Sequence, residues 1–448
     1  MNILIAGDSE VALHIAELLA NEKHNVSLIC PNKELLKVIE SHSDLMTFVG
    51  DSTSIQVLQE INPKRTDLLI SVHLDGRVNL LTAIMAKKLG VKKCIAKLHE
   101  VETITAEYKE FCKSLGIDFL VSPEKIAAKE IVNLLNNTAA TEIFDFSDNQ
   151  LSLMLIKLES DAPVIGKSLS QIAEEQQHLD FRAVAIHRRA RTIIPKGDDV
   201  FQEGDMAYVI TKPNGIEQLL EMGGKQRFEI FNVMIVGGGA VGKMAAAALE
   251  KKFNITLFDI NHERCEELSE YLSDTLIING DARDITLLED ENISAMDAFV
   301  AVTNNSETNI LTCLLARKYG VKKTIALVEN LDFIDISQNV GIDTIINKKL
   351  GTASYIIRFT MAAEVISTKC LIGINAEVFE FVAAPDSPVT KKAIRKLKFP
   401  AKAIIGGIIR QGMGYIAVGD FQIEAGDKVV VFALPQAFHQ VDKMFRNK

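Results

Sequence analysis

The stretch VMIVGGGAVGKMAAAALEKKF, residues 233–253, decides the fold. Four apolar residues lead into a glycine-rich turn, and a segment with the composition of a helix follows. Gly237, Gly239 and Gly242 form the pattern G-x-G-x-x-G. In such a loop the first glycine permits the tight turn, the second lets the backbone approach a pyrophosphate, and the third lets the helix pack on the strand. The stretch therefore predicts a strand, a phosphate-binding loop and a helix.

An acidic residue follows where this motif requires one. The run ITLFDI, residues 255–260, predicts the next strand and contains Asp259, 22 residues after Gly237. A carboxylate there accepts hydrogen bonds from an adenosine ribose and repels a 2′-phosphate, so we expect NAD(H) or ATP/ADP and poor binding of NADP(H). The alternative is a tight turn without a ligand. The predicted loop comprises Gly237, Gly238, Gly239, Ala240, Val241 and Gly242.

Two later turns are candidates for the same site, because ligands bind at the carboxyl ends of parallel strands. Gly280 and Asp281 follow the third predicted strand, and Thr303 and Asn304 follow the fourth. Asp281 could contact the adenine side and Thr303 or Asn304 the phosphates, with plain turn and capping roles as the alternative. Lys243 could reach a phosphate or stay solvated.

The whole motif belongs to an internal duplication. Laying residue 2 on residue 232 aligns NILIAG with NVMIVG, and residues 79–100 match residues 309–330 at 11 of 22 positions. A second block repeats at an offset of 222 to 225, where the turns at 197–198 and 204–205 match those at 419–420 and 426–427. The chain is therefore two copies of a pair of modules.

Short apolar runs alternating with helical patterns predict doubly wound parallel sheets of the Rossmann type in the first module of each pair. Polar alternation and turn signals predict a small α+β domain with antiparallel strands in the second. We expect a first Rossmann-like domain at 1–121, a connecting helix at 122–140, an α+β domain at 141–225, a second Rossmann-like domain at 230–350, a second connecting helix at 351–371 and a second α+β domain at 372–448.

The connecting helices differ in their apolar patterns. The first helix begins at Ser122, Pro123 and Glu124, and an apolar stripe runs along one face of it. The second, near residues 352–367, is apolar almost all round, which predicts a subunit interface. The stripe of the first helix is Ala127, Ile131, Leu134 and Leu135.

The glycine loop of the first copy has diverged. Ser9 replaces the second glycine, and Asp8 and Glu10 oppose an anion. Cys30 stands in the place of the ribose-binding acid, whereas Ala12 is tolerable because that position serves helix packing. Lys97 could bind an anion or remain solvated. We expect this first site to be degenerate, or to bind something else.

Composition narrows the function further. The net charge of −10 disfavours nucleic-acid binding, and the chain lacks a run of about 18 apolar residues, which a spanning helix needs. The N-terminus reads as a strand and not as a signal peptide, which predicts a cytoplasmic protein. The six cysteines show no CxxC or Cys/His cluster, so we expect no metal site.

The sequence shows no catalytic motif beside the glycine loop: no nucleophile elbow, HExxH, Walker lysine or Tyr-x-x-x-Lys pair. We therefore expect no catalytic residues and a binding protein that is not an enzyme. The alternatives are an NAD-dependent oxidoreductase and a nucleotide-free scaffold of a transporter.

The duplicated pairs, the GGGAVG loop with Asp259, the GDA turn at 280–282 and the TNNSETN segment at 303–309 together resemble the peripheral regulatory subunits of Trk potassium uptake systems, built from RCK/KTN domains. The resemblance covers essentially the whole chain. It implies RCK N-terminal and C-terminal domains, binding of NAD(H) or ATP/ADP, and a homo-oligomer, a dimer or tetramer ring. It also implies a position on the cytoplasmic face of the membrane, on an integral membrane potassium transporter subunit whose gate the nucleotide controls.

Overall fold

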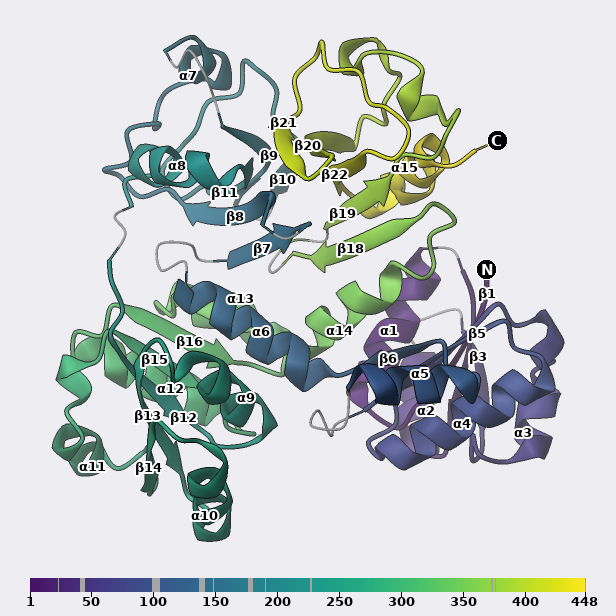
Figure 1. Ribbon diagram of the computed structural model, residues 1–448, viewed down its shortest axis with the longest axis horizontal. Helices are drawn as coiled ribbons and strands as arrows, with labels where there is room; N and C mark the ends of the chain where they lie inside the picture. The colour runs from purple at the N-terminus through teal and green to yellow at the C-terminus, as the bar shows by residue number, and fades with distance from the viewer. Residues whose placement is uncertain are drawn as a thin grey trace. The chain divides into compact units, whose positions relative to one another are not determined.

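The chain divides into two compact units, Met1–Ile126 with Lys348–Thr360 and Ala127–Asn347 with Met361–Lys448. The computed structural model in Figure 1 describes residues 1–22, 24–40, 45–98, 105–136, 142–147, 149–175, 180–189, 191–225, 228–371, 374 and 376–447.

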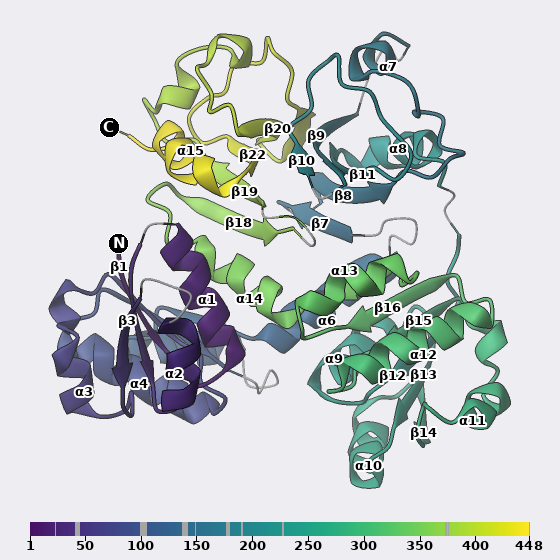
Figure 2. The same cartoon turned by 180° about the vertical axis from the view of Figure 1, so that it is seen from behind.

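The first unit contains a six-stranded parallel sheet of order β3-β2-β1-β4-β5-β6. This order is that of a doubly wound sheet, as the sequence predicts. Figures 1 and 2 show α4 and α5 on one face of the sheet and α1 and α2 on the other. The elements are β1 (Asn2–Ala6), α1 (Glu10–Asn21), β2 (Asn25–Cys30), α2 (Lys33–Glu40), β3 (Met46–Val49), α3 (Ile55–Glu60), β4 (Leu68–Ser71), α4 (Gly76–Leu89), β5 (Lys93–Lys97), α5 (Ala106–Ser114) and β6 (Phe119–Val121).

The second unit contains a sheet of the same kind, with the order β14-β13-β12-β15-β16-β17 and parallel pairing throughout. Its elements are β12 (Asn232–Val236), α9 (Ala240–Leu249), β13 (Asn254–Asp259), α10 (His262–Tyr271), β14 (Thr275–Asn279), α11 (Ile285–Asp290), β15 (Ala298–Ala301), α12 (Ser306–Lys318), β16 (Lys323–Leu327), α13 (Asp332–Asn339) and β17 (Thr344–Ile346).

The two connecting helices are exchanged between the halves. Helix α6 (Pro123–Asn136) begins in the first unit, and its predicted stripe is buried in a core cluster with β12 and α9 of the second copy. Helix α14 (Lys348–Ile357) belongs to the first unit, where it contacts α1. The predicted end of the first helix, residues 137–140, and the start of the next domain at 141 lie outside the described residues.

The second connecting helix departs from its prediction in two respects. It ends at Ile357 instead of 371, and Val365–Cys370 forms strand β18, because a run with two β-branched residues at its start pairs with β19 (Glu377–Val382). Its apolar sides are covered within this chain, since Ile356 is buried and Phe359 lies against Phe119 with ring centroids 4.0 Å apart. Packing within this chain therefore accounts for the apolar pattern, and the subunit interface stays a prediction.

A buried ion cluster holds α6 in the second unit. Lys369 Nζ on β18 lies 2.5 Å from Glu130 Oε1 on α6 and 3.1 Å from Glu142 Oε1 on β7 (Glu142–Phe146). Burial alone would lower the pKa of Lys369, but the two carboxylates outweigh it and hold that pKa above its usual range. Loss of the ammonium would leave two buried acids without their cation.

The two C-terminal modules are five-stranded sheets with antiparallel pairing, as predicted. Their orders are β10-β9-β11-β8-β7 and β18-β19-β22-β20-β21. One buried cluster joins residues of both sheets, including Tyr208 and Phe432. The elements not yet given are β8 (Leu151–Lys157), α7 (Leu169–Glu175), β9 (Phe181–Arg188), β10 (Arg191–Ile193), β11 (Met206–Thr211), α8 (Ile216–Met222), β20 (Ala403–Arg410), β21 (Met413–Ile416), β22 (Lys428–Ala433) and α15 (Phe438–Phe445).

All six cysteines are buried free thiols. Among the described helices, none has both the length and the apolar character of a membrane span. Within the same residues, no group of three or more His, Cys, Asp or Glu side chains is placed to hold a metal ion.

Candidate functional site

The glycine loop of the second copy joins the end of β12 to the start of α9, and its first glycine is required by backbone geometry. Gly237 has φ of 105°, in the left-handed region. A Cβ at this position would lie 2.8 Å from the backbone nitrogen of Thr303. The loop after β12 therefore runs against the loop after β15, and the structure brings these two predicted parts of the site together.

The third glycine serves the packing of helix against loop. A Cβ at Gly242 would lie 1.9 Å from the carbonyl oxygen of Gly237. Gly238 is also confined, because a Cβ there would lie 2.4 Å from Leu268 Cδ1. Gly242 excludes a side chain because the close contact is with backbone, whereas at Gly238 the end of the Leu268 side chain would have to shift.

Gly239 differs from its neighbours because it faces open space. A Cβ built on it would have no heavy atom within 4 Å. Gly239 is the N-cap of α9, no side chain caps that helix end, and Ala240 and Val241 form its first turn. The free N–H groups of a helix N-terminus attract anions. The loop therefore presents backbone donors where a phosphate can approach.

Asp259 lies at the end of β13 and supports the loop. Its carboxylate is 6% exposed, and Oδ2 accepts a hydrogen bond of 2.7 Å from Gly238 N. Oδ1 accepts one of 2.8 Å from Asn261 N. The structure thus places the predicted ribose-binding acid beside the glycine loop, where it already accepts two backbone hydrogen bonds.

Arg264 is a residue of this site that the sequence reading missed. Its Nη1 lies 3.2 Å from Asp259 Oδ2. A guanidinium there offsets the negative charge of Asp259, which weakens the electrostatic argument against a 2′-phosphate. The only signal in the sequence was a basic residue in the first turn of the helix after the predicted acid.

The turn after β14 is held by its own side chains. Asp281 accepts a hydrogen bond of 2.9 Å from Arg283 N and lies 2.6 Å from Arg283 Nη2. These hydrogen bonds from Arg283 hold the pKa of Asp281 below its usual range. Gly280 N donates to the carbonyl of Asp259 at 3.0 Å, which ties the turn to β13. This geometry favours the turn role for Asp281 over a ligand contact.

The turn after β15 is organised by a buried asparagine, Asn309. Its Oδ1 accepts from Thr303 N at 3.0 Å and from Thr303 Oγ1 at 2.7 Å. Its Nδ2 donates to the carbonyls of Thr303 and Leu327, at 3.0 and 2.8 Å. Asn304 is exposed at the tip of the turn. The signal for Asn309 in the sequence is that the first copy has an asparagine, Asn79, at the equivalent position.

Lys243, for which the sequence allows either a phosphate contact or a solvated position, lies near the start of α9. It is half-buried, and its Nζ stands 4.0 Å from the centroid of the Tyr271 ring. A cation over an aromatic face is a favourable contact. In this structure Lys243 packs against α10.

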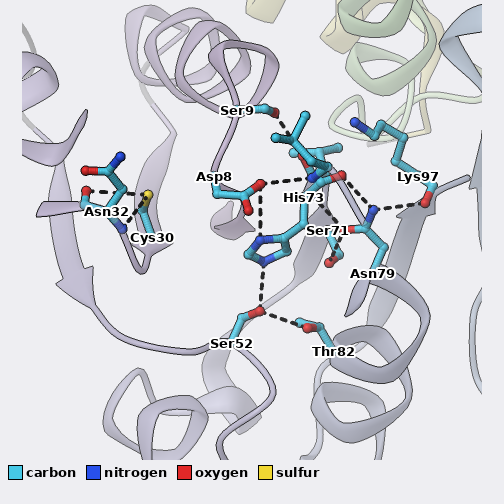
Figure 3. A network of polar contacts seen from close by, with 12 residues as sticks. Asp8, Ser9, Cys30, Asn32, Ser52, Ser71, His73, Asn79, Thr82 and Lys97 are labelled. Carbon is cyan, nitrogen blue, oxygen red and sulfur yellow. Dashed lines mark hydrogen bonds and ion pairs between the residues drawn. The ribbon is translucent and has the colours of Figure 1, made fainter. Parts of the chain in front are cut away.

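In the first copy, polar side chains form a network of contacts at the corresponding loops (Figure 3). Asp8 Oδ1 accepts a hydrogen bond of 2.9 Å from Leu74 N and lies 3.5 Å from His73 Nδ1. Ser9 Oγ donates to the carbonyl of Val72 at 3.0 Å. The loop after β1 is thus bonded directly to the loop after β4.

His73 continues this network into the protein. Its Nε2 lies 2.8 Å from Ser52 Oγ, which is also 2.8 Å from Thr82 Oγ1. His73 is 4% exposed and Ser52 is completely buried, and Figure 3 shows the contacts from Asp8 through His73 to Ser52 and Thr82. Burial lowers the pKa of the imidazole, although Asp8 acts in the opposite direction.

The remaining divergent residues of the first copy are also engaged. Cys30 is a buried thiol 3.4 Å from Asn32 N, and burial raises its pKa. Glu10 forms an ion pair with Lys349 of α14. Lys97 is 2% exposed, so the expectation of a solvated lysine is wrong.

Comparison with known proteins gives the family. The model of the TrkA-N domain matches residues 3–123 and 233–348, and that of the TrkA-C domain matches residues 153–222 and 378–446. The chain is 30% identical over 455 residues to the Trk system potassium uptake protein TrkA of Vibrio alginolyticus, covering 100% of this chain and 99% of that protein. It is also 30% identical to the TrkA homolog 1 of Methanosarcina mazei, with 100% of both chains covered.

Among solved structures, the chain resembles the GsuK RCK domain with a TM-score of 0.61 and 17% identity, covering 99% of this chain and 95% of that one. The GsuK channel bound to NAD gives a TM-score of 0.60 at 17% identity, over 98% of this chain and 78% of that one. At this identity the likeness shows the fold alone. With both domain models matched twice and a full-length relative at 30% identity, the chain belongs to the TrkA family of potassium uptake proteins.

Proposed function

We propose that this protein is a nucleotide-responsive regulatory subunit of a Trk-type potassium uptake system. The nucleotide, NAD(H) or ATP/ADP, binds in the cleft of the second Rossmann-like domain. The observation that carries the proposal is the open space in front of Gly239, at an uncapped helix N-terminus beside Asp259.

The known relatives support the biological setting of this proposal. Full-length relatives are potassium uptake proteins, and the solved GsuK structures include forms bound to NAD and to ADP. In the proposal the chain forms a homo-oligomer, a dimer or tetramer ring, and sits on the cytoplasmic face of an integral membrane potassium transporter subunit. Nucleotide that binds one state of this assembly more tightly than another shifts its gate.

The proposal assigns no catalytic role to the cleft. Asp259 and Asp281 hold backbone N–H groups and arginines, and Thr303 bonds Asn309, so each of these polar groups already has a structural partner. An oxidoreductase needs an acid or base aimed at a substrate. We therefore expect NADH to bind without being consumed.

The first cleft is proposed to have lost this ligand. Ser9 places a hydroxyl where Gly239 leaves space, and Asp8 places a carboxylate near the same helix end. The two copies therefore offer a matched pair of variants. Gly239→Ser introduces the residue of the first copy into the second, and Ser9→Gly makes the reverse change.

The test is calorimetric titration of the full-length protein with NADH and with ATP. We expect one nucleotide per chain, and at least about tenfold weaker binding in Gly239→Ser. Because the space in front of Gly239 is open, this variant folds normally, and its unfolding midpoint serves as the control. Ser9→Gly should bind nucleotide as the unchanged protein does.

Three outcomes contradict the proposal. Steady oxidation of NADH with an added substrate would identify an oxidoreductase, and the absence of binding to the unchanged protein would identify a scaffold. Equal loss of binding in Ser9→Gly would place the ligand in the first cleft. Copurification of the chain with a membrane protein, identified by mass spectrometry, tests the proposed partner separately.

A further inference from the structure

The first C-terminal module contains an apolar cavity of about 200 Å³ between its sheet and the helices α7 and α8. Buried residues from β8, β9, β11 and α8 contribute to its wall. Ala173, exposed on α7, also lines it, so the cavity reaches the surface there. Its main apolar lining residues are Ile156, Val164, Ile172, Phe181, Leu219 and Met222.

In the second C-terminal module, side chains of the chain itself pack at the positions that correspond to this cavity. Strand pairing aligns the two modules residue by residue. In the first module Lys157 of β8 pairs with Met206 of β11, and in the second Val382 of β19 pairs with Lys428 of β22. Ile156 therefore corresponds to Phe381. Helices α8 and α15 each follow a Pro-x-x turn at an offset of 222, so Gly223 corresponds to Phe445.

Phenylalanine rings pack the core of the second module. Phe381 and Phe445 are stacked, with centroids 4.6 Å apart and planes 8° apart. Phe379 lies against Phe438 at 5.0 Å. The first module carries Met154, Ile156, Ile216 and Gly223 at these four positions.

Of these four positions, Ile156 and Gly223 line the cavity. There the two rings of the second module are replaced by a smaller side chain at Ile156 and by no side chain at Gly223, where a Cβ would lie 2.9 Å from Ile156 Cγ2. A void of this size forfeits packing contacts unless something occupies it. The module nonetheless retains the same sheet and both flanking helices.

We propose that this cavity is a binding site for a small uncharged aromatic molecule of one or two rings. Such a ligand replaces the stacked rings that the second module supplies from its own chain. An apolar cavity of about 150 Å³ in another protein stays dry and binds benzene, so the volume here admits a ligand of this class.

The described lining is almost entirely apolar, which favours an uncharged ligand. Among the described lining residues Arg182 is the one that carries a charge, and its guanidinium donates a hydrogen bond to the carbonyl of Ala417 in the second C-terminal module. A bound water needs two to four polar partners, and the described apolar lining residues have no polar side-chain atoms to offer.

Indole is a suitable probe, because the chain contains no tryptophan and the fluorescence of added indole is observed directly. We expect indole to bind the full-length protein with a dissociation constant of about 1 mM or lower and to raise its unfolding midpoint. Toluene, which lacks the N–H group, should compete with it. Nucleotide binding should be unchanged, which separates this site from the proposed nucleotide cleft.

Filling the cavity provides the decisive variant. Ile156→Phe combined with Gly223→Phe restores the ring pair of the second module and should weaken indole binding at least about tenfold while preserving the unfolding midpoint. Ala183→Leu fills the cavity from β9, and it replaces the double variant if that one does not fold. Absence of indole binding at about 10 mM, or undiminished binding in a folded, filled variant, would refute the site.

Discussion

The two Rossmann-like domains share one frame but differ in the loop that joins the first strand to the first helix. In the second copy, Gly239 leaves open space before the helix N-terminus. In the first copy, Ser9 bonds Val72 and Asp8 bonds Leu74, so the loop is tied to its neighbour by its own side chains. The two copies thus differ in whether side chains of the loop after the first strand bond to the loop after the fourth.

The frame that both copies keep lies behind the cleft. Asn79 and Asn309 are completely buried and bond the loops after two neighbouring strands. Asp67 and Asp297 each accept hydrogen bonds from the backbone at the start of the first strand of their sheet. The duplication preserved residues that shape the backbone and released those that would face a ligand.

The largest effect is expected from removing the frame asparagines. Asn309→Ala leaves the N–H of Thr303 and the carbonyl of Leu327 without their partner, and should lower the free energy of unfolding of the second unit by about 3 kcal/mol. Asn79→Ala should do the same in the first unit. Urea unfolding gives the magnitude, and hydrogen exchange locates the change.

The exposed residue Asn304 is the control, because Asn304→Ala should change stability by less than about 0.5 kcal/mol. Nucleotide binding should be lost in Asn309→Ala and kept in Asn79→Ala. If Asn309→Ala and Asn79→Ala were as stable as Asn304→Ala, the structural role of the two buried asparagines would be contradicted.

A smaller effect is expected from exchanging the third residue of the glycine motif. In Gly242→Ala the new methyl group lies 1.9 Å from the carbonyl oxygen of Gly237, so the loop must move. We expect a loss of about 2 kcal/mol in stability and a fall of at least about 100-fold in nucleotide affinity. Calorimetry and thermal unfolding measure the two quantities.

The reverse exchange, Ala12→Gly, should cost about 1 kcal/mol through helix propensity and leave nucleotide binding unchanged. The first copy accommodates Ala12 because Gly7 lies outside the left-handed region, whereas Gly237 has φ of 105°. The Cβ of Ala12 would still lie only 2.5 Å from one built on Gly7. If Gly242→Ala kept full affinity, the turn of the second copy would be as adaptable as that of the first.

The sequence predicted the parts of this comparison that depend on local pattern. The glycine loop, the parallel strands and the duplication are read from spacing alone.

The exchange of α6 and α14 was not predicted, because an apolar stripe does not say which sheet covers it. Arg264 was missed for a similar reason, since its contact with Asp259 depends on how α10 follows its strand. The end of the second connecting helix was predicted too late because strand pairing overrode a helical pattern.

The smallest effect concerns the pH dependence of the first cleft. Burial holds the pKa of His73 below its usual value, so the unfolded chain takes up a proton before the folded protein does. The stability of the first unit should therefore fall as the pH drops below about 6.5. His73→Thr, which introduces the residue of the second copy, should reduce this fall.

Unfolding of the unchanged protein and of His73→Thr, measured between pH 7.5 and 5, gives the difference in the pH dependence of their stability. The groups that face His73 are Asp8, Asp51, Lys97 and Ser52, and all four remain in the variant. His14, whose pKa is also lowered by burial, remains as well, so its contribution cancels. If both proteins lost stability equally as the pH fell, the protons that destabilise the first unit would bind elsewhere. The Asp8–His73 contact would then add no pH dependence to the link between the two loops.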